Sequence, residues 1–248
     1  ALALIDYMKK SLLISLIFLV IVLDGRTQSF EGTITYSVEF EMKGEFVNLK
    51  DQIFEKLRNE GGYYDTMKVY IKQGRYKKVD NSLNQKSVIF LPDQNKIYSL
   101  EEESEFVAII DASKIAAINL NFPEPDLVNV DSIKFINGIP CDILKLSWEN
   151  LGEEWYFFNK ETAVIEPSLY ADHNYEYLNK VLSSTGSYPL EMVKSMNNVM
   201  SIRMTLVSIE GGELSDDLFS IPELKKANKK MTKMMDNITG TQVMKIKN

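Results

Sequence analysis

The stretch from Phe30 to Met42, Phe-Glu-Gly-Thr-Ile-Thr-Tyr-Ser-Val-Glu-Phe-Glu-Met, decides the fold. Every even-numbered position in it is apolar or glycine, and every odd-numbered position is polar. Because successive side chains of a strand point to opposite faces, the pattern predicts one long strand with a buried face and a solvated face. A helix would spread the same residues around its whole circumference. The question for function is therefore what lies against the buried face.

The chain beyond this strand is typical of an antiparallel sheet. Short alternating segments are separated by turn signals at Pro92-Asp93-Gln94-Asn95, Asn137-Gly138 and Asn197-Asn198. Strands at such close spacing favour a meander over βαβ units. Two segments, Phe46–Glu60 and Tyr170–Leu182, instead carry apolar residues at helical spacing. We therefore predict a mainly β (α+β) fold, in which a curved antiparallel sheet forms an incomplete β-barrel with two helices on its concave face.

The start of the chain resembles a targeting segment. Met8-Lys9-Lys10 precedes the apolar run Leu12–Leu23 and a polar exit at residues 24–29. This order predicts a secretory signal peptide from Met8 to about Ser29, and a periplasmic or secreted protein. The apolar run is shorter than the roughly 20 residues of a spanning helix, although an N-terminal membrane anchor is the alternative. The predicted division is residues 1–28 as upstream and signal sequence, 29–222 as one β-rich domain, and 223–248 as a basic, Met-rich tail that is helical or disordered.

Composition narrows the function classes. The formal net charge is -7, so the chain lacks the cationic surface that neutralises phosphates, and nucleic acid is not an expected partner. Cys141 is the one cysteine, so an intrachain disulfide is excluded.

No catalytic or metal-binding motif is recognisable. His173 is the one histidine, and nothing in the sequence places it beside Cys141, which we expect to be a small buried hydrophobe. Asp172, His173 and Glu176 could share a helical face, but a surface patch explains them more simply than a metal site. We expect no enzymatic activity, no cofactor and no metal.

The apolar surface remains as the candidate site. The first strand, the first helix and the last hairpin contribute side chains able to line an apolar cavity: Ile34, Tyr36, Val38, Phe40, Phe54, Leu57, Met200, Ile202, Met204 and Leu206. Methionine repacks around varied shapes, which favours an adaptable cavity. The alternative is that these residues form an ordinary core.

Five short motifs carry a resemblance to a known family: Phe30-Glu-Gly-Thr-Ile-Thr-Tyr, Met67-Lys-Val-Tyr-Ile-Lys, Gly138-Ile-Pro-Cys-Asp, Ser208-Ile-Glu and Leu218-Phe-Ser-Ile-Pro. Their order resembles an uncharacterised family of Gram-negative periplasmic proteins that is similar to the LolA/LppX-like lipoprotein-carrier superfamily. The resemblance implies an incomplete barrel curled around helices, a cavity for acyl chains and no catalytic residues. The chain departs from the carriers in placing its first helix after the first strand.

These observations give two functional hypotheses. The first is an extracytoplasmic binding protein whose apolar cavity carries or senses a lipid or an acylated lipoprotein. The alternative is a non-enzymatic structural or interaction module of the cell envelope without a ligand cavity. In either case, tail lysines could contact an envelope protein or a membrane surface: Lys225, Lys226, Lys229 and Lys230.

Overall fold

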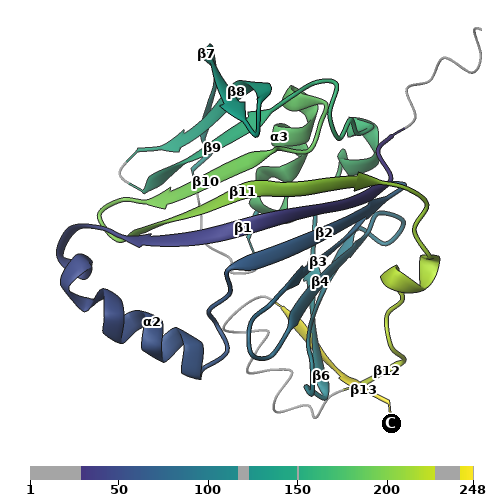
Figure 1. Ribbon diagram of the computed structural model, residues 1–248. Coiled ribbons are helices and arrows are strands. Elements are labelled where there is room, and N and C mark those ends of the chain that lie inside the picture. The colour runs from purple at the N-terminus through teal and green to yellow at the C-terminus, as the bar shows by residue number, and fades with distance from the viewer. Residues whose placement is uncertain (1–28, 117–122, 150, 227–240, 248) are drawn as a thin grey trace, which may run out of the picture.

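The computed structural model describes residues 29–116, 123–149, 151–226 and 241–247. One antiparallel 13-stranded sheet runs in the order β12-β13-β6-β5-β4-β3-β2-β1-β11-β10-β9-β8-β7 (Figure 1). The strands are β1 Gly32–Met42, β2 Thr66–Lys72, β3 Arg75–Asp80, β4 Lys86–Leu91, β5 Lys96–Glu101, β6 Phe106–Asp111, β7 Asp126–Ile136, β8 Ile139–Trp148, β9 Gly152–Phe158, β10 Glu191–Met196, β11 Met200–Gly211, β12 Leu224–Lys226 and β13 Gln242–Ile246. The predicted fold class, a curved antiparallel sheet with helices, is confirmed. Within the described residues no helix is long and apolar enough to cross a membrane.

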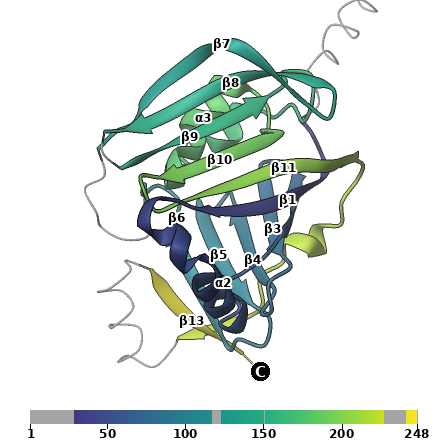
Figure 2. The same cartoon turned by 60° about the vertical axis from the view of Figure 1, so that its left-hand side comes forward.

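Strand β1 is the centre of the sheet, and its alternation is as predicted. Ile34 and Tyr36 are fully buried, whereas Glu39 and Glu41 are exposed. β11 pairs with β1 along its whole length to Met42, but β2 pairs with it only as far as Ser37. The strands on the two sides of β1 therefore separate, and Figures 1 and 2 show them running at a steep angle to one another. This bend makes the sheet concave.

Helix α3, Leu178–Thr185, covers the concave face. Val181 and Tyr177 pack there against Leu144 and Leu146 of β8 and against the aromatic residues of β9. The predicted helix from Tyr170 is broken into the short turns η2, Pro167–Tyr170, and η3, Tyr175–Tyr177. The break has a backbone cause, because Glu176 and Tyr177 have φ angles of 52° and 56° and residues in that left-handed region do not propagate a right-handed helix.

Helix α2, Lys50–Asn59, follows the short helix η1, Gly44–Leu49, and together they correspond to the predicted helix Phe46–Glu60. It lies at the end of the sheet to which β1 leads (Figures 1 and 2). Phe54 is its one buried residue and contacts the rings of Phe40 and Tyr63, with centroids 6.3 and 5.8 Å away. The expectation that both helices cover the concave face therefore holds for α3, whereas α2 is anchored at the sheet's end by one aromatic side chain.

The C-terminal segment packs on the opposite, convex face and edge of the sheet. Phe219 in η4, Asp216–Phe219, joins Ile89, Tyr98 and Val107 in an apolar cluster. These three strand residues alternate with the concave-face positions, so the cluster lies on the other side of the sheet.

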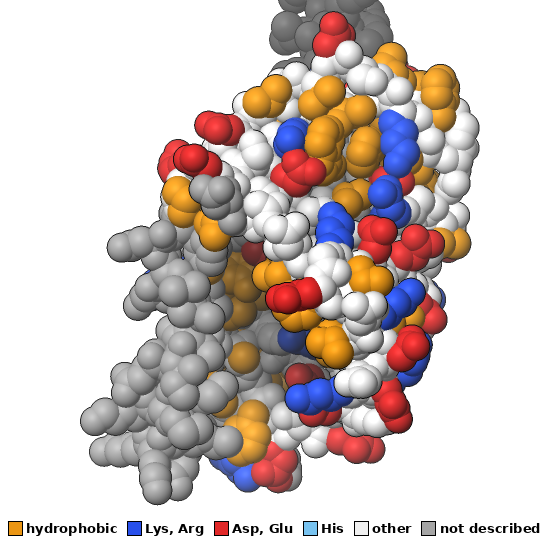
Figure 3. Space-filling view, turned by 90° about the vertical axis from the view of Figure 1, so that its left-hand side faces the viewer, with side chains coloured by type: hydrophobic (Ala, Val, Ile, Leu, Met, Phe, Trp, Pro, Cys, Tyr) orange, Lys and Arg blue, Asp and Glu red, His pale blue; other side chains and the backbone are white. Residues whose placement is uncertain are grey.

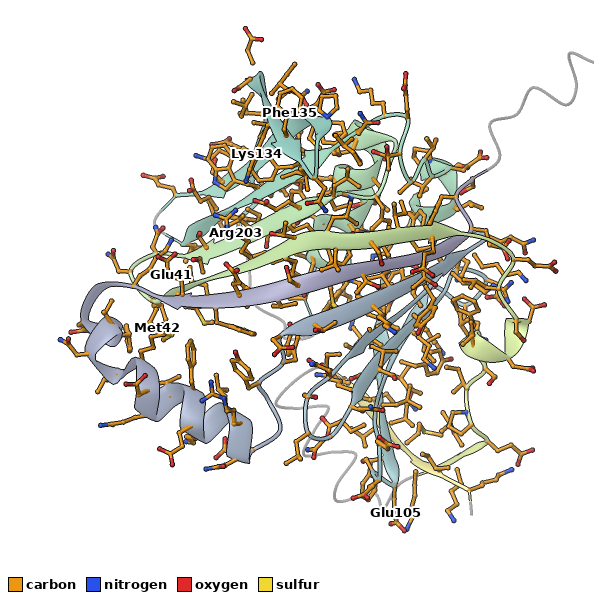
Figure 4. The ribbon with its side chains drawn as sticks, in the orientation of Figure 1. Glu41, Met42, Glu105, Lys134, Phe135 and Arg203 are labelled. Atoms are coloured by element: carbon orange, nitrogen blue, oxygen red, sulfur yellow. The ribbon has the colours of Figure 1, made fainter. Side chains whose placement is uncertain are left out.

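The described parts of the tail, β12 and β13, are strands rather than the predicted helix or disordered end. Val243 is buried, and Met244 and Ile246 pack against the convex cluster, which explains why this segment joins the sheet edge beside β6. Lys245 Nζ also lies 2.7 Å from Glu105, labelled at the lower end of the sheet in Figure 4. Lys225 is exposed on β12. The predicted signal peptide, Lys229 and Lys230 lie outside the described residues.

Candidate functional site

A cavity of about 420 Å³ lies on the concave face, between the two halves of the sheet and the segment that leads into α3. Its apolar lining comes from both sides of β1: Met67, Val88, Ile97, Ile110, Met192 and Met204. These strands bring together residues far apart in sequence because the sheet bends at β1. Figure 3 shows that the surface is hollowed on the side of the molecule that carries α2, with hydrophobic side chains inside the hollow.

An ion cluster stands on one wall of the cavity. Lys194 Nζ lies 2.8 Å from Glu176 and 3.5 Å from Glu154, and Tyr156 donates a hydrogen bond to Glu154. Lys194 holds the pKa of Glu176 down to about 2. Burial lowers the pKa of Lys194, but the neighbouring carboxylates outweigh this and raise it well above its usual value. Both groups are therefore charged at neutral pH.

The ion cluster is only partly buried. The Glu176 side chain keeps 51% of its accessible surface and Lys194 keeps 27%, although both line the cavity wall.

The backbone at Glu176 is held in an uncommon conformation. Two successive non-glycine residues, Glu176 and Tyr177, are left-handed, at a cost of about 1–3 kcal/mol each. Three hydrogen bonds hold them: Glu176 N–H donates to the Ile115 carbonyl at 2.8 Å, Tyr177 N–H to the Asn174 carbonyl at 2.8 Å, and Tyr177 Oη to the Pro123 carbonyl at 3.0 Å. This geometry places the Glu176 carboxylate against Lys194 of β10.

Lys78 of β3 lines the same cavity. It alternates with Lys77 and so shares the concave face with Tyr76, over whose ring its Nζ lies at 5.0 Å. Among the described residues, no carboxylate oxygen lies within ion-pair distance of it. Burial lowers the pKa of Lys78.

Two buried polar side chains on the lining have unused hydrogen-bonding groups. His173 Nε2 is paired with Tyr76 Oη at 3.0 Å, but His173 Nδ1 and Tyr188 Oη have no partner in the part of the chain that the structure describes. Burial, and next the charge of Lys78, lower the pKa of His173 to about 4, so its ring is neutral at pH 7. His173 is 1% exposed, which corrects the expectation that it belongs to a surface patch.

The described residues contain no group of three or more His, Cys, Asp or Glu side chains that could hold a metal. Cys141 is fully buried and donates to the Ile139 carbonyl at 3.4 Å, as expected of a small core residue.

The structure places the ten predicted cavity residues in four different environments. Ile202 and Met204 line the cavity on the concave face. Val38, Phe40 and Phe54 line a second, more open hollow of about 680 Å³ beside α2. Ile34, Tyr36 and Leu206 are in the packed core, where Tyr36 Oη donates to the Pro189 carbonyl at 2.6 Å. Leu57 and Met200 are partly exposed and line neither of these two cavities.

The polar wall was not predicted from the sequence, although a signal for part of it exists. Lys194 occupies the same alternation phase as Met192, and Lys78 the same phase as Tyr76, so both charges fall at positions that face inward. A charge at such a position is costly unless it is paired or serves a function. Glu176 and Tyr188 lie outside the strands, and alternation could not place them.

No protein-family model matches the chain, and no curated protein matches it in sequence. Among solved structures it is similar to PNGF-II, with 10% identity, a TM-score of 0.44 and coverage of 82% of this chain and 32% of that one. It is also similar to the Pseudomonas aeruginosa MucA/MucB complex, with 10% identity, a TM-score of 0.35 and coverage of 76% and 56%. A LolA superfamily protein from Nitrosomonas europaea matches with 6% identity, a TM-score of 0.23 and coverage of 79% and 92%.

The chain spans only 32% and 56% of the lengths of the first two of these structures. At such low identities and scores the similarities concern a distant likeness of fold. The functional argument therefore rests on the cavity.

Proposed function

We propose that this chain is a non-enzymatic, extracytoplasmic binding protein that holds a lipid or the acyl group of an acylated protein in the cavity on the concave face. The observation that supports this proposal is the cavity itself, whose volume of about 420 Å³ combines apolar walls with a few charged groups. Ligand sites typically have this composition and size. The extracytoplasmic location is proposed from the signal-like pattern of residues 8–29.

The size of the cavity suits an acyl chain. A group the size of a water molecule, such as a methylene, takes up roughly 30 Å³, so the cavity of about 420 Å³ accommodates about a dozen of them. Each methylene transferred from water contributes about 0.8 kcal/mol, so a chain that fills the cavity could bind tightly. Met67, Met192 and Met204 supply flexible walls that can adjust to chains of different shape.

The proposal is tested by asking whether the cavity carries a ligand. The full chain is expressed and purified, and its organic extract is analysed by mass spectrometry. After lipid removal, the protein is titrated with a fluorescent fatty-acyl probe. We expect co-purified lipid and saturable probe binding. Wild-type protein with neither would contradict the proposal and favour the structural or interaction module.

Two variants on β11 localise the binding. Ile202→Asp places a charge on the cavity wall at a partly buried position and should abolish probe binding. Val207→Asp is the matched control, because Val207 lies on the same strand, at the bulge in the β1–β11 ladder, and is 58% exposed. Circular dichroism establishes that both variants are folded. Equal probe binding by both would place the ligand elsewhere. Ile34→Asp is unsuitable, because Ile34 is 0% exposed and its substitution tests folding.

A further inference from the structure

We infer that the ligand is an acyl chain with an anionic head, whose charge is held by Lys78 and whose oxygen accepts a hydrogen bond from Tyr188. This inference rests on the proposed binding function and specifies the ligand class. A carboxylate and a phosphate share the required chemistry.

Lys78 supplies the unneutralised positive charge. Two other lysines belong to the lining: Lys194, which already contacts two carboxylates at 2.8 and 3.5 Å, and Lys86, which is exposed to solvent. Lys78 Nζ lies over the face of the Tyr76 ring and feels the charge of Glu176, but no carboxylate oxygen of the described residues lies within ion-pair distance of it. A lysine on an apolar wall is costly without a counter-charge, so an anion that enters the cavity would gain a strong partner.

Tyr188 supplies a neutral hydrogen-bond donor on the same lining. Its side chain is 2% exposed, and its N–H donates to the Ala163 carbonyl at 2.9 Å, which holds its backbone in place. The contrast with Tyr36 is informative, since that equally buried hydroxyl is satisfied by the Pro189 carbonyl. Tyr188 Oη has no such acceptor in the described parts of the chain. Burial raises its pKa, so the hydroxyl remains a donor at neutral pH.

The carboxylates on the lining do not offer an equivalent site for a cationic head. Glu176 is occupied by Lys194. Asp80 Oδ1 accepts hydrogen bonds from the Ser82 N–H, the Ser82 hydroxyl and the Lys86 N–H, at 3.1, 2.5 and 3.1 Å. A cation would have only the other oxygen of Asp80 to pair with, whereas an anion would meet Lys78 directly.

The experiment is a competition assay on the delipidated full chain, with amphiphiles that share one saturated tail. The heads are a carboxylate, a phosphate monoester, a trimethylammonium group and an uncharged alcohol, each displacing the fluorescent acyl probe. We expect the anionic heads to compete about tenfold or more better than the alcohol, because hydrogen bonds to a charged group are the stronger kind. The ranking of carboxylate against phosphate separates a free fatty acid from a phosphorylated lipid.

Three variants test the assignment. Lys78→Met should bring the anionic heads to within about twofold of the alcohol, and leave the alcohol's own affinity nearly unchanged. Lys78→Arg should retain the preference, and Tyr188→Phe should reduce it severalfold. Lys77→Met is the matched control, since this neighbouring lysine lies on the other face of β3 and its loss should change nothing.

The outcomes separate the inference from the proposed function. Equal competition by all four heads, or a preference for trimethylammonium, would overturn the anionic head while leaving a lipid-binding protein. An anion preference that survives Lys78→Met would overturn the role of Lys78. Failure of every amphiphile to compete, together with no probe binding, would contradict the binding function itself.

Discussion

Removing the positive charge of Lys194 should destabilise the protein in a pH-dependent way. Lys194 is the main cause of the low pKa of Glu176, which falls from the usual 4.5 to about 2. That difference corresponds to about 3 kcal/mol at 1.36 kcal/mol for each pKa step. The Glu176 side chain is 51% exposed, so water screens the pair, and we expect Lys194→Met to cost about 1–2 kcal/mol at pH 7.

The pH dependence follows from the sign of the shift. A carboxyl group whose pKa is lower in the folded state stabilises the fold above its unfolded pKa and loses that effect on acidification. The difference in stability between wild type and Lys194→Met should be constant from pH 8 to about pH 5. It should then shrink as the pH falls from about 4.5 toward 2.

Urea denaturation followed by the fluorescence of Trp148 and Trp155 measures this difference. A loss of about 1.5 kcal/mol lowers the midpoint by about 0.5 M if the slope is about 3 kcal/mol/M. Lys160→Met is the control, because the Lys160–Asp142 pair, 3.5 Å apart, is 68% and 54% exposed and should be worth less than about 0.5 kcal/mol. A Lys194→Met difference as large at pH 3 as at pH 7 would refute the reasoning.

Three further predictions concern the core. Tyr36→Phe removes the donor from the buried Pro189 carbonyl and should lower the unfolding free energy by about 1–3 kcal/mol, measured by urea denaturation. NMR should show His173 titrating near pH 4, and a ring pKa above 6 would contradict its burial. Because its pKa in the folded state is lowered from 6.5, the unfolding free energy should fall as the pH drops from about 6.5 to 4. Gly32→Ala places a Cβ 2.1 Å from the Glu210 carbonyl oxygen and should lower the melting temperature, whereas Gly212→Ala, with no atom within 4 Å, should not.

The sheet could be predicted because strand alternation is a local signal. The phase of β1 and the hairpin turns at Asn137-Gly138 and Asn197-Asn198 follow from residues a few positions apart. The second predicted helix was only partly correct, because Glu176 and Tyr177 adopt left-handed backbone angles that depend on hydrogen bonds to distant carbonyls such as those of Ile115 and Pro123. The strand at Gln242–Ile246 was missed for a similar reason, since its apolar residues pack against β-strands far away in the chain.

The candidate site was predicted less completely than the sheet. Alternation showed which residues share a face but not whether that face is packed or hollow. Ile202 and Met204 line the cavity, whereas Ile34 and Leu206, on the same face, are packed core. The charged wall arises only when β3 and β10, separated by more than a hundred residues, meet across the bend.

Strand β1 has two roles along its inward face, packed core and the border of a hollow, and the pairing of its neighbours explains the change. At Ile34 and Tyr36, β1 is paired on both sides, so its inward side chains are enclosed by β2 and β11 and form core. Beyond Ser37 only β11 continues, and the sheet opens. From that point the inward residues Val38 and Phe40 border a hollow, and their partners across the β1–β11 ladder, Met204 and Ile202, line the cavity. The same apolar alternation therefore yields packed core at one end of the strand and cavity wall at the other, and the end of the β1–β2 ladder marks the transition.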